Sequence, residues 1–225
     1  MFGPTHVGAL LAGGVIGACI ILAGRCFPAS RLVKIMERAF SVFLFITPFV
    51  PAWSQWREGA FDLESVLPAQ YCDLAAFAGA AALWTHRHVF CEIVYFFGLS
   101  GTLQGLLTPA LTRDYPSFSY FHFFTAHVAV VIASLYVVLA LRHEPRPGAV
   151  WRATMVMSCY AASAGVLNAA LHTNFGFLCA KSPNPSLLDY LGPWPWYLVP
   201  LWFVGLLFYS ALYLPFWLAR RRVAA

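Results

Sequence analysis

Charged residues are scarce in this sequence. Lys, Arg, Asp and Glu together make up 10% of the 225 residues, whereas a soluble domain usually carries about 25%. Apolar residues take their place, at 60% of the chain, and they are gathered into long runs. This composition excludes an ordinary soluble enzyme and indicates a protein whose surface faces lipid.

Several familiar chemical motifs are also missing. The sequence has no CxxC pair, no HExxH, no P-loop and no GxSxG. The last apolar run contains no lysine, which excludes a retinal Schiff base. His86 and His88 form one close pair, but neither an acid nor a thiol pattern surrounds them. We therefore predict no metal site and no cofactor.

The long apolar runs predict an all-α membrane protein. About 20 residues at ~1.5 Å rise cross a ~30 Å hydrocarbon core, so a run of about 18 or more predicts a spanning helix. Seven such runs fill the chain, which predicts one seven-helix transmembrane domain over residues 1–225. The predicted spans are about 7–24, 35–53, 69–85, 89–107, 118–141, 153–171 and 194–218.

The first run and the basic residues predict the orientation. No Lys or Arg precedes Arg25, so the run does not resemble a cleavable signal peptide and suits a first span with its N-terminus outside. In that orientation, eleven of the fourteen Lys and Arg residues fall in cytoplasmic segments, as the positive-inside rule requires. Gly13 and Gly17 form a small-xxx-small pair, which predicts close helix packing.

Polar residues gather in the outer halves of four predicted helices. Such side chains are costly in a membrane, so they indicate a pocket open to the outer side. The proline-rich loop 172–193 would be a lid over this pocket, or alternatively only a well-packed connection. The predicted pocket residues are Gln70, Gln104, Asn168, His172 and Asn174.

Three residues are candidates for catalysis. His127 could act as a general base, or it could only form an interhelical hydrogen bond. Asp73 could orient His127, or it could be an acid favoured at a helix N-terminus. Cys72 could be a nucleophile, or it could form a disulfide with Cys179 in the loop. The spacing of these residues leaves each pair of alternatives open.

Three stretches resemble the bacterial YwaF-like integral membrane proteins over about residues 35–218. They are "LPAQYCDLAAF" (67–77), "YFFGLSGTLQGLLTP" (95–109) and "TNFGFLCAKSPNPSLLDYLGPWPWY" (173–197). More distantly, the chain is similar to eukaryotic transmembrane protein 164, considered a cysteine-dependent phospholipid acyltransferase, and to the androgen-induced membrane hydrolases. The resemblance implies that His127 is the matching catalytic histidine. It also puts Ala69 at the family's cysteine position, with Cys72 about one helical turn further on.

These observations lead to one functional hypothesis and one alternative. The leading hypothesis is a lipid acyl hydrolase or acyltransferase in the cytoplasmic membrane of a bacterium, with His127 as base and Cys72 or a water as nucleophile. Its partner would be a membrane lipid or acyl substrate and not a nucleic acid. The alternative is a non-catalytic carrier of a small molecule or ion, or a lipid-binding receptor, that uses the same pocket.

Overall fold

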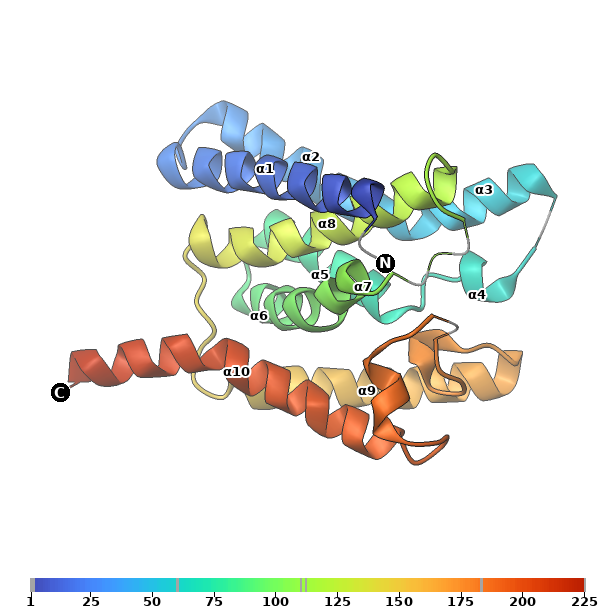
Figure 1. Cartoon of the computed structure of the whole chain (residues 1–225). Helices are drawn as coiled ribbons and strands as arrows, with labels where there is room; N and C mark the ends of the chain where they lie inside the picture. Colours follow the sequence, from blue (N-terminus) through green and yellow to red (C-terminus); the bar gives the residue numbers. More distant parts are fainter. Residues whose placement is uncertain (1–2, 60, 110, 112, 183, 225) are drawn as a thin grey trace.

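The computed structural model describes residues 3–59, 61–109, 111, 113–182 and 184–224, and contains no β-strand in these ranges. Figure 1 shows long helices that run back and forth roughly antiparallel to one another. The all-α prediction is confirmed. The elements are α1 (Pro4–Cys26), α2 (Arg31–Ile46), η1 (Thr47–Phe49), α3 (Val50–Glu58), α4 (Leu63–Val66), α5 (Tyr71–Thr85), α6 (His88–Phe97), η2 (Gly98–Thr102), α7 (Leu103–Leu107), α8 (Phe118–Leu139), α9 (Ala149–Leu171), η3 (Phe175–Phe177), η4 (Leu187–Leu191) and α10 (Leu198–Ala224).

Six helical segments of the described chain are long and apolar enough to cross a membrane. The predicted span 35–53 is not among them, because α2, η1 and α3 divide it. Pro48 and Pro51 lie in this stretch, and proline cannot donate the backbone hydrogen bond that continues an α-helix. The six segments are Pro4–Cys26, Leu63–Thr85, His88–Leu107, Phe118–Leu139, Ala149–Leu171 and Leu198–Arg222.

The helices form layers. In Figure 1, α1 and α2 lie on one side, α9 and α10 lie on the other, and α5, α6 and α8 lie between them. The core is in this middle layer, where Phe96 and Phe97 of α6 and Val137 of α8 are fully buried. By contrast, only 6% of the spanning window of α10 is buried, which leaves that helix available to lipid.

Glycines bring α1 against α8. A Cβ atom at Gly13 would lie 2.8 Å from Cγ1 of Val128, and one at Gly17 would lie 2.9 Å from Cγ1 of Ile132. Real Cβ atoms do not approach other atoms so closely, so only glycine allows this separation of the two helices. The close packing predicted from the small-xxx-small pair is confirmed.

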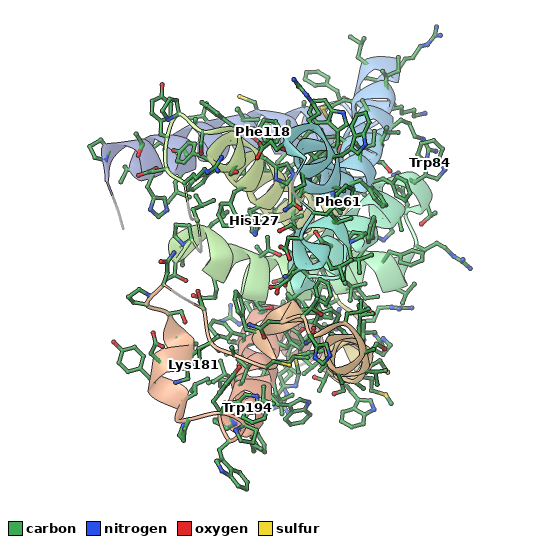
Figure 2. The ribbon with its side chains drawn as sticks, turned by 90° about the vertical axis from the view of Figure 1, so that its right-hand side faces the viewer. Phe61, Trp84, Phe118, His127, Lys181 and Trp194 are labelled. Atoms are coloured by element: carbon green, nitrogen blue, oxygen red, sulfur yellow. The ribbon has the colours of Figure 1, made fainter. Side chains whose placement is uncertain are left out.

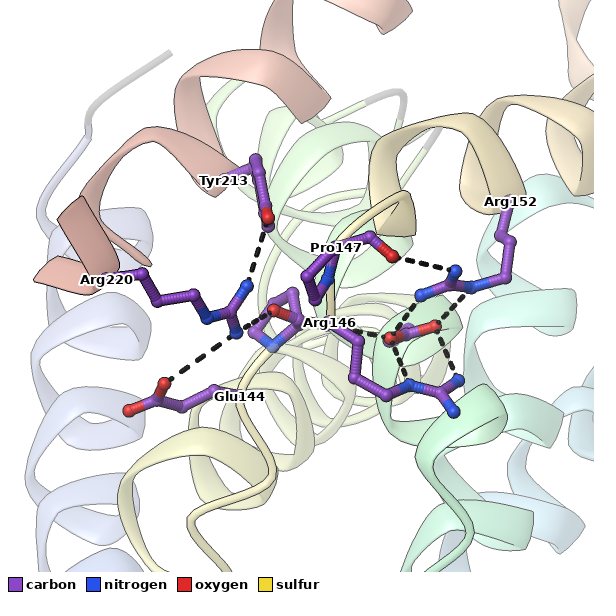
Figure 3. A network of polar contacts seen from close by, with 8 residues as sticks. Glu144, Arg146, Pro147, Arg152, Tyr213 and Arg220 are labelled. Carbon is purple, nitrogen blue, oxygen red and sulfur yellow. Dashed lines mark hydrogen bonds and ion pairs between the residues drawn. The ribbon is translucent and has the colours of Figure 1, made fainter. Parts of the chain in front are cut away.

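A buried carboxylate fixes the connection between α8 and α9 (Figure 3). Glu92 of α6 is 3% exposed, and its two oxygens accept hydrogen bonds from the guanidinium groups of Arg146 and Arg152 at 2.8–3.2 Å. Beside it, Arg220 of α10 donates to the hydroxyl of Tyr213 at 3.0 Å. These bonds join α6, the connection and α9 at one end of the bundle, opposite the end where the predicted catalytic residues lie.

Candidate functional site

His127 lies near the middle of α8, stacked on the ring of Phe123 with the two ring centroids 4.0 Å apart. Its Nδ1 is 2.9 Å from the carbonyl oxygen of Phe123, one turn earlier. A carbonyl can only accept, so Nδ1 carries the proton, and in the neutral ring Nε2 then holds the lone pair. Within the described ranges, Nε2 has no hydrogen-bond partner. The half-buried ring is therefore held in place with its acceptor nitrogen free.

A glycine face of η2 and α7 lies against His127. A Cβ atom at Gly105 would be 3.2 Å from Cδ2 of His127, and one at Gly101 would be 2.5 Å from Cε1 of Tyr71. These two glycines are one turn apart, so this face contacts α8 at one point and α5 at the other. In Figure 2, His127 points from α8 toward the neighbouring green ribbon of α7. We call this place the α5–α7–α8 junction.

The backbone of this junction is irregular. Residues Gly98–Thr102 form a π-helical turn between α6 and α7. Such turns are frequent at functional sites, because they shift the side chains that follow. The hydroxyl of Thr102 in this turn is buried and has no hydrogen-bond partner among the described residues.

Cys72 lies at the N-terminus of α5, next to the tyrosine that packs on the glycine face. The hydroxyl of Tyr71 is 2.7 Å from that of Tyr209 in α10, and its ring stacks on Phe97 with centroids 4.6 Å apart. This packing fixes the first turn of α5, and the thiol of Cys72 is half-buried and free. No hydrogen bond joins Cys72 to His127 in the part of the chain that the structure describes.

Asp73 caps α5. Its Oδ2 accepts from the backbone N–H of Gln70 at 2.9 Å, and the Gln70 side chain accepts from the backbone N–H of Asp73. This reciprocal pair is a capping box, which satisfies free donors at a helix start. The structure thus assigns Asp73 to the helix N-terminus, and the carbonyl of Phe123 takes the orienting position beside His127.

Two asparagines shape the loop after α9. Asn168 is 2% exposed and bonds the backbone N–H and carbonyl of Phe175 at 2.7 and 3.0 Å. Asn174 accepts from the backbone N–H groups of Cys179 and Ala180 at 2.8 and 3.0 Å. Both side chains therefore stabilise the conformation of the loop itself. The spacing of polar residues in the sequence does not distinguish this role from that of lining a pocket.

The loop is fastened to the rest of the bundle at several points. Gly176 donates to Oε1 of Gln70 at 3.1 Å, and Asn174 donates from its backbone to Glu64 of α4 at 3.1 Å. Asn184 donates to the carbonyl of Pro109 at 3.0 Å, which ties the loop to the end of α7. The loop therefore extends across the ends of α4, α5 and α7, on the side of the bundle where the junction lies (Figure 1).

Comparison with known families identifies the chain. A model of the TMEM164 family matches residues 1–213, nearly the whole sequence. The chain belongs to the TMEM164 family. The relationship to transmembrane protein 164 suggested by the sequence motifs is confirmed. No curated protein and no solved structure matches the chain significantly.

The other predicted residues of this TMEM164-family chain have varied surroundings. Cys72 and Cys179 are both free thiols, so the structure holds no bridge between them. His172 ends α9 with a left-handed backbone (φ 55°). Among the described residues, the side chain of Gln104 makes no hydrogen bond, and its neighbour Gly105 contacts His127.

Sequence reasoning missed the parts of the site that come from the backbone. Gly101, Gly105 and the carbonyl of Phe123 have no side-chain chemistry of their own. The available signal was the i,i+4 spacing of the two glycines within a run that was already predicted to be a helix. The described residues also contain no group of three or more His, Cys, Asp or Glu that could hold a metal ion.

Proposed function

We propose that the chain is a lipid acyl hydrolase or acyltransferase that uses His127 as its general base. The supporting observation is the hydrogen bond from Nδ1 to the carbonyl of Phe123. It leaves Nε2 as an acceptor beside Gly105, whose lack of a side chain lets α7 lie close to the ring. A general base needs such a fixed, accessible lone pair.

The proposed reaction is an ordinary acyl transfer with base catalysis. Nε2 of His127 removes a proton from the nucleophile, which is the thiol of Cys72 or a water molecule, as the nucleophile attacks the ester carbonyl carbon. The carbonyl oxygen becomes an oxyanion, for which the uncommitted amide of Gln104 is the proposed donor. The ester bond then breaks, and the protonated His127 returns its proton to the departing alcohol oxygen. With Cys72 as nucleophile, water or an acceptor hydroxyl then removes the acyl group from sulfur.

A matched pair of histidines on α8 tests the proposal. His122 donates from Nε2 to the carbonyl of Thr47, 3.0 Å away, so its lone pair lies on Nδ1, whereas in His127 the acceptor nitrogen is Nε2. In phosphatidylcholine nanodiscs with labelled acyl chains, we expect His127→Gln to lower acyl release or transfer by about 10²- to 10⁴-fold. His122→Gln should retain most of the activity.

The outcomes separate the candidate functions. Unchanged turnover in a folded His127→Gln protein would refute the catalytic role of this residue. Wild-type protein that binds the labelled lipid without turning it over would favour the alternative, a carrier or lipid-binding receptor. Circular dichroism and thermal unfolding of each variant serve as the folding controls.

We also propose that the segment of residues 31–58 crosses the membrane as a seventh, kinked span with the N-terminus of the chain outside. The support is the distribution of Lys and Arg, eleven of which fall in segments that this topology puts in the cytoplasm. The protein would be located in the cytoplasmic membrane of a bacterium, as the resemblance to the YwaF-like proteins suggests.

A further inference from the structure

A second site lies at the opposite end of the bundle. A cleft of about 800 Å³ opens where α1, α5 and α8 end and α2 begins. Its lining includes Ala140, thirteen residues after His127 along α8, or roughly 20 Å away at ~1.5 Å per residue. The cleft is therefore separate from the α5–α7–α8 junction. Its charged lining residues are Arg25, Lys34, Glu37, Arg38 and Arg142, and His86 also lines it.

Among the described residues, three of the four basic side chains of the cleft have no hydrogen-bond or ion-pair partner. Arg38 donates to the carbonyl of Trp84 and its guanidinium lies 4.4 Å from the centre of that ring. Arg25, Lys34 and Arg142 make no side-chain hydrogen bond or ion pair with any described residue. They come from the end of α1, the first turn of α2 and the turn after α8, and so reach the cleft from three sides.

The single acid of the cleft is already engaged. Glu37 is 8% exposed and accepts a hydrogen bond from the hydroxyl of Tyr136 at 2.7 Å. Its other oxygen is 3.6 Å from Nε2 of His86. Gly24 allows α1 to approach this pair, since a Cβ there would collide with the Tyr136 hydroxyl. Glu37 is thus engaged by Tyr136 and His86, and among the described residues no ion pair joins it to Arg25, Lys34 or Arg142.

The charge of the cleft remains positive after its local partners are included. The ends of α1, α5 and α8 contribute about half a negative charge each, and the start of α2 about half a positive charge. Together with Glu37, these offset roughly two of the four basic side chains. A cleft with an excess of one sign raises the local concentration of ions of the other sign.

The orientation of the chain in a membrane does not account for this convergence. The positive-inside rule asks only that basic residues lie somewhere in the cytoplasmic segments. Arg31 and Arg222 meet that requirement at the same end without lining the cleft. Arg25, Lys34 and Arg142 meet it as well, but they also share one concave site.

We propose that this basic cleft binds a phosphate group, supplied by the head group of an anionic phospholipid. Arg and Lys side chains without acidic partners are the usual ligands of phosphate oxygens. Basic pockets between spanning helices at the cytoplasmic side are also suited to anionic head groups. The apolar wall formed by Leu141 and Ala140 would contact the start of the acyl chains.

The test compares two double variants of the full chain in phosphatidylcholine nanodiscs that contain phosphatidic acid. Lys34→Gln/Arg142→Gln removes two charges from the cleft, and Arg31→Gln/Arg222→Gln removes two from the same end outside it. Native mass spectrometry measures the phosphatidic acid that remains bound. We expect the cleft variant to bind about fivefold more weakly for each removed charge. The control should bind as the wild type does.

A second arm distinguishes the source of the phosphate. Excess inorganic phosphate that displaces phosphatidic acid would identify free phosphate as a ligand of the same site, whereas retention would identify the lipid. Equal losses in both double variants would overturn the proposal, as would wild-type protein that retains neither phosphatidic acid nor phosphate. Should the cleft variant fail to fold, the single Lys34→Gln variant against Arg31→Gln gives the same comparison.

Discussion

At the scale of single residues, the two thiols on the loop side of the bundle differ in their surroundings. Cys179 is exposed, whereas Cys72 is half-buried beside the α5–α7–α8 junction. If Cys72 is the nucleophile, Cys72→Ala should abolish labelling by an acyl-directed covalent probe, and the matched Cys179→Ala should leave it unchanged. Retained labelling in Cys72→Ala would exclude Cys72 as the labelled nucleophile, and retained lipid turnover without labelling would assign the attack to water. Peptide mapping without reductant should find both thiols free, and a linked pair would contradict this.

The sequence predicted which residues of the site are polar, but not what each one contacts. His127 was recognised because a histidine deep in a span is unusual. Its orienting partner is a backbone carbonyl, which every residue has, so no residue type marks it. The other predicted polar residues cap a helix or anchor the loop, namely Asp73, Gln70, Asn168 and Asn174. Backbone groups near a membrane need hydrogen-bond partners, so a polar side chain there can serve the backbone instead of a substrate.

At the scale of helices, the packing of α1 on α8 can be tested with two glycines of the same helix. Gly17 meets the side chain of Ile132, whereas a Cβ at Gly14 would meet nothing within 4 Å. Gly17→Leu should therefore force α1 away from α8 and lower stability by about 1–3 kcal/mol. Gly14→Leu should change it little. Thermal unfolding in the same detergent measures both, and equal stability of the two variants would contradict the close packing.

Helix existence was easier to predict than helix regularity. The long apolar runs predicted the six spanning segments correctly. In a membrane, an apolar segment forms a helix because its backbone N–H and C=O groups must then bond to each other. The division of residues 31–58 follows from Pro48 and Pro51, whose effect depends on how neighbouring helices pack. The π-helical turn at Gly98–Thr102 has no comparable sequence signal, since it depends on tertiary contacts with α5 and α8.

At the scale of the whole molecule, the two ends of the bundle differ in chemistry. One end carries the loop, the capped start of α5 and His127. The other carries the basic cleft and the Glu92 network. The proposed orientation would expose the first end to the outside and the second to the cytoplasm, where anionic lipids and the basic residues attract each other.

This topology is open to direct test by cysteine labelling in intact cells, in a background without the native exposed cysteines. Asn184→Cys lies in the loop that the proposal puts outside, and Pro147→Cys lies in the connection between α8 and α9 that it puts inside. A membrane-impermeant maleimide should label Asn184→Cys in intact cells, and Pro147→Cys only after permeabilisation. The reverse pattern would overturn the orientation and move His127 to the cytoplasmic side.

The same assay tests the seventh span. Glu58 ends α3, on the far side of the proposed kinked crossing from Arg31. If residues 31–58 cross the membrane, Glu58→Cys should be labelled from outside, like Asn184→Cys, whereas Arg31→Cys should be labelled only after permeabilisation. Labelling of both positions from the same side would contradict the crossing. Since the chain would then have six spans, its two ends would lie on one side of the membrane, and a C-terminal tag read in the same cells supplies the independent check.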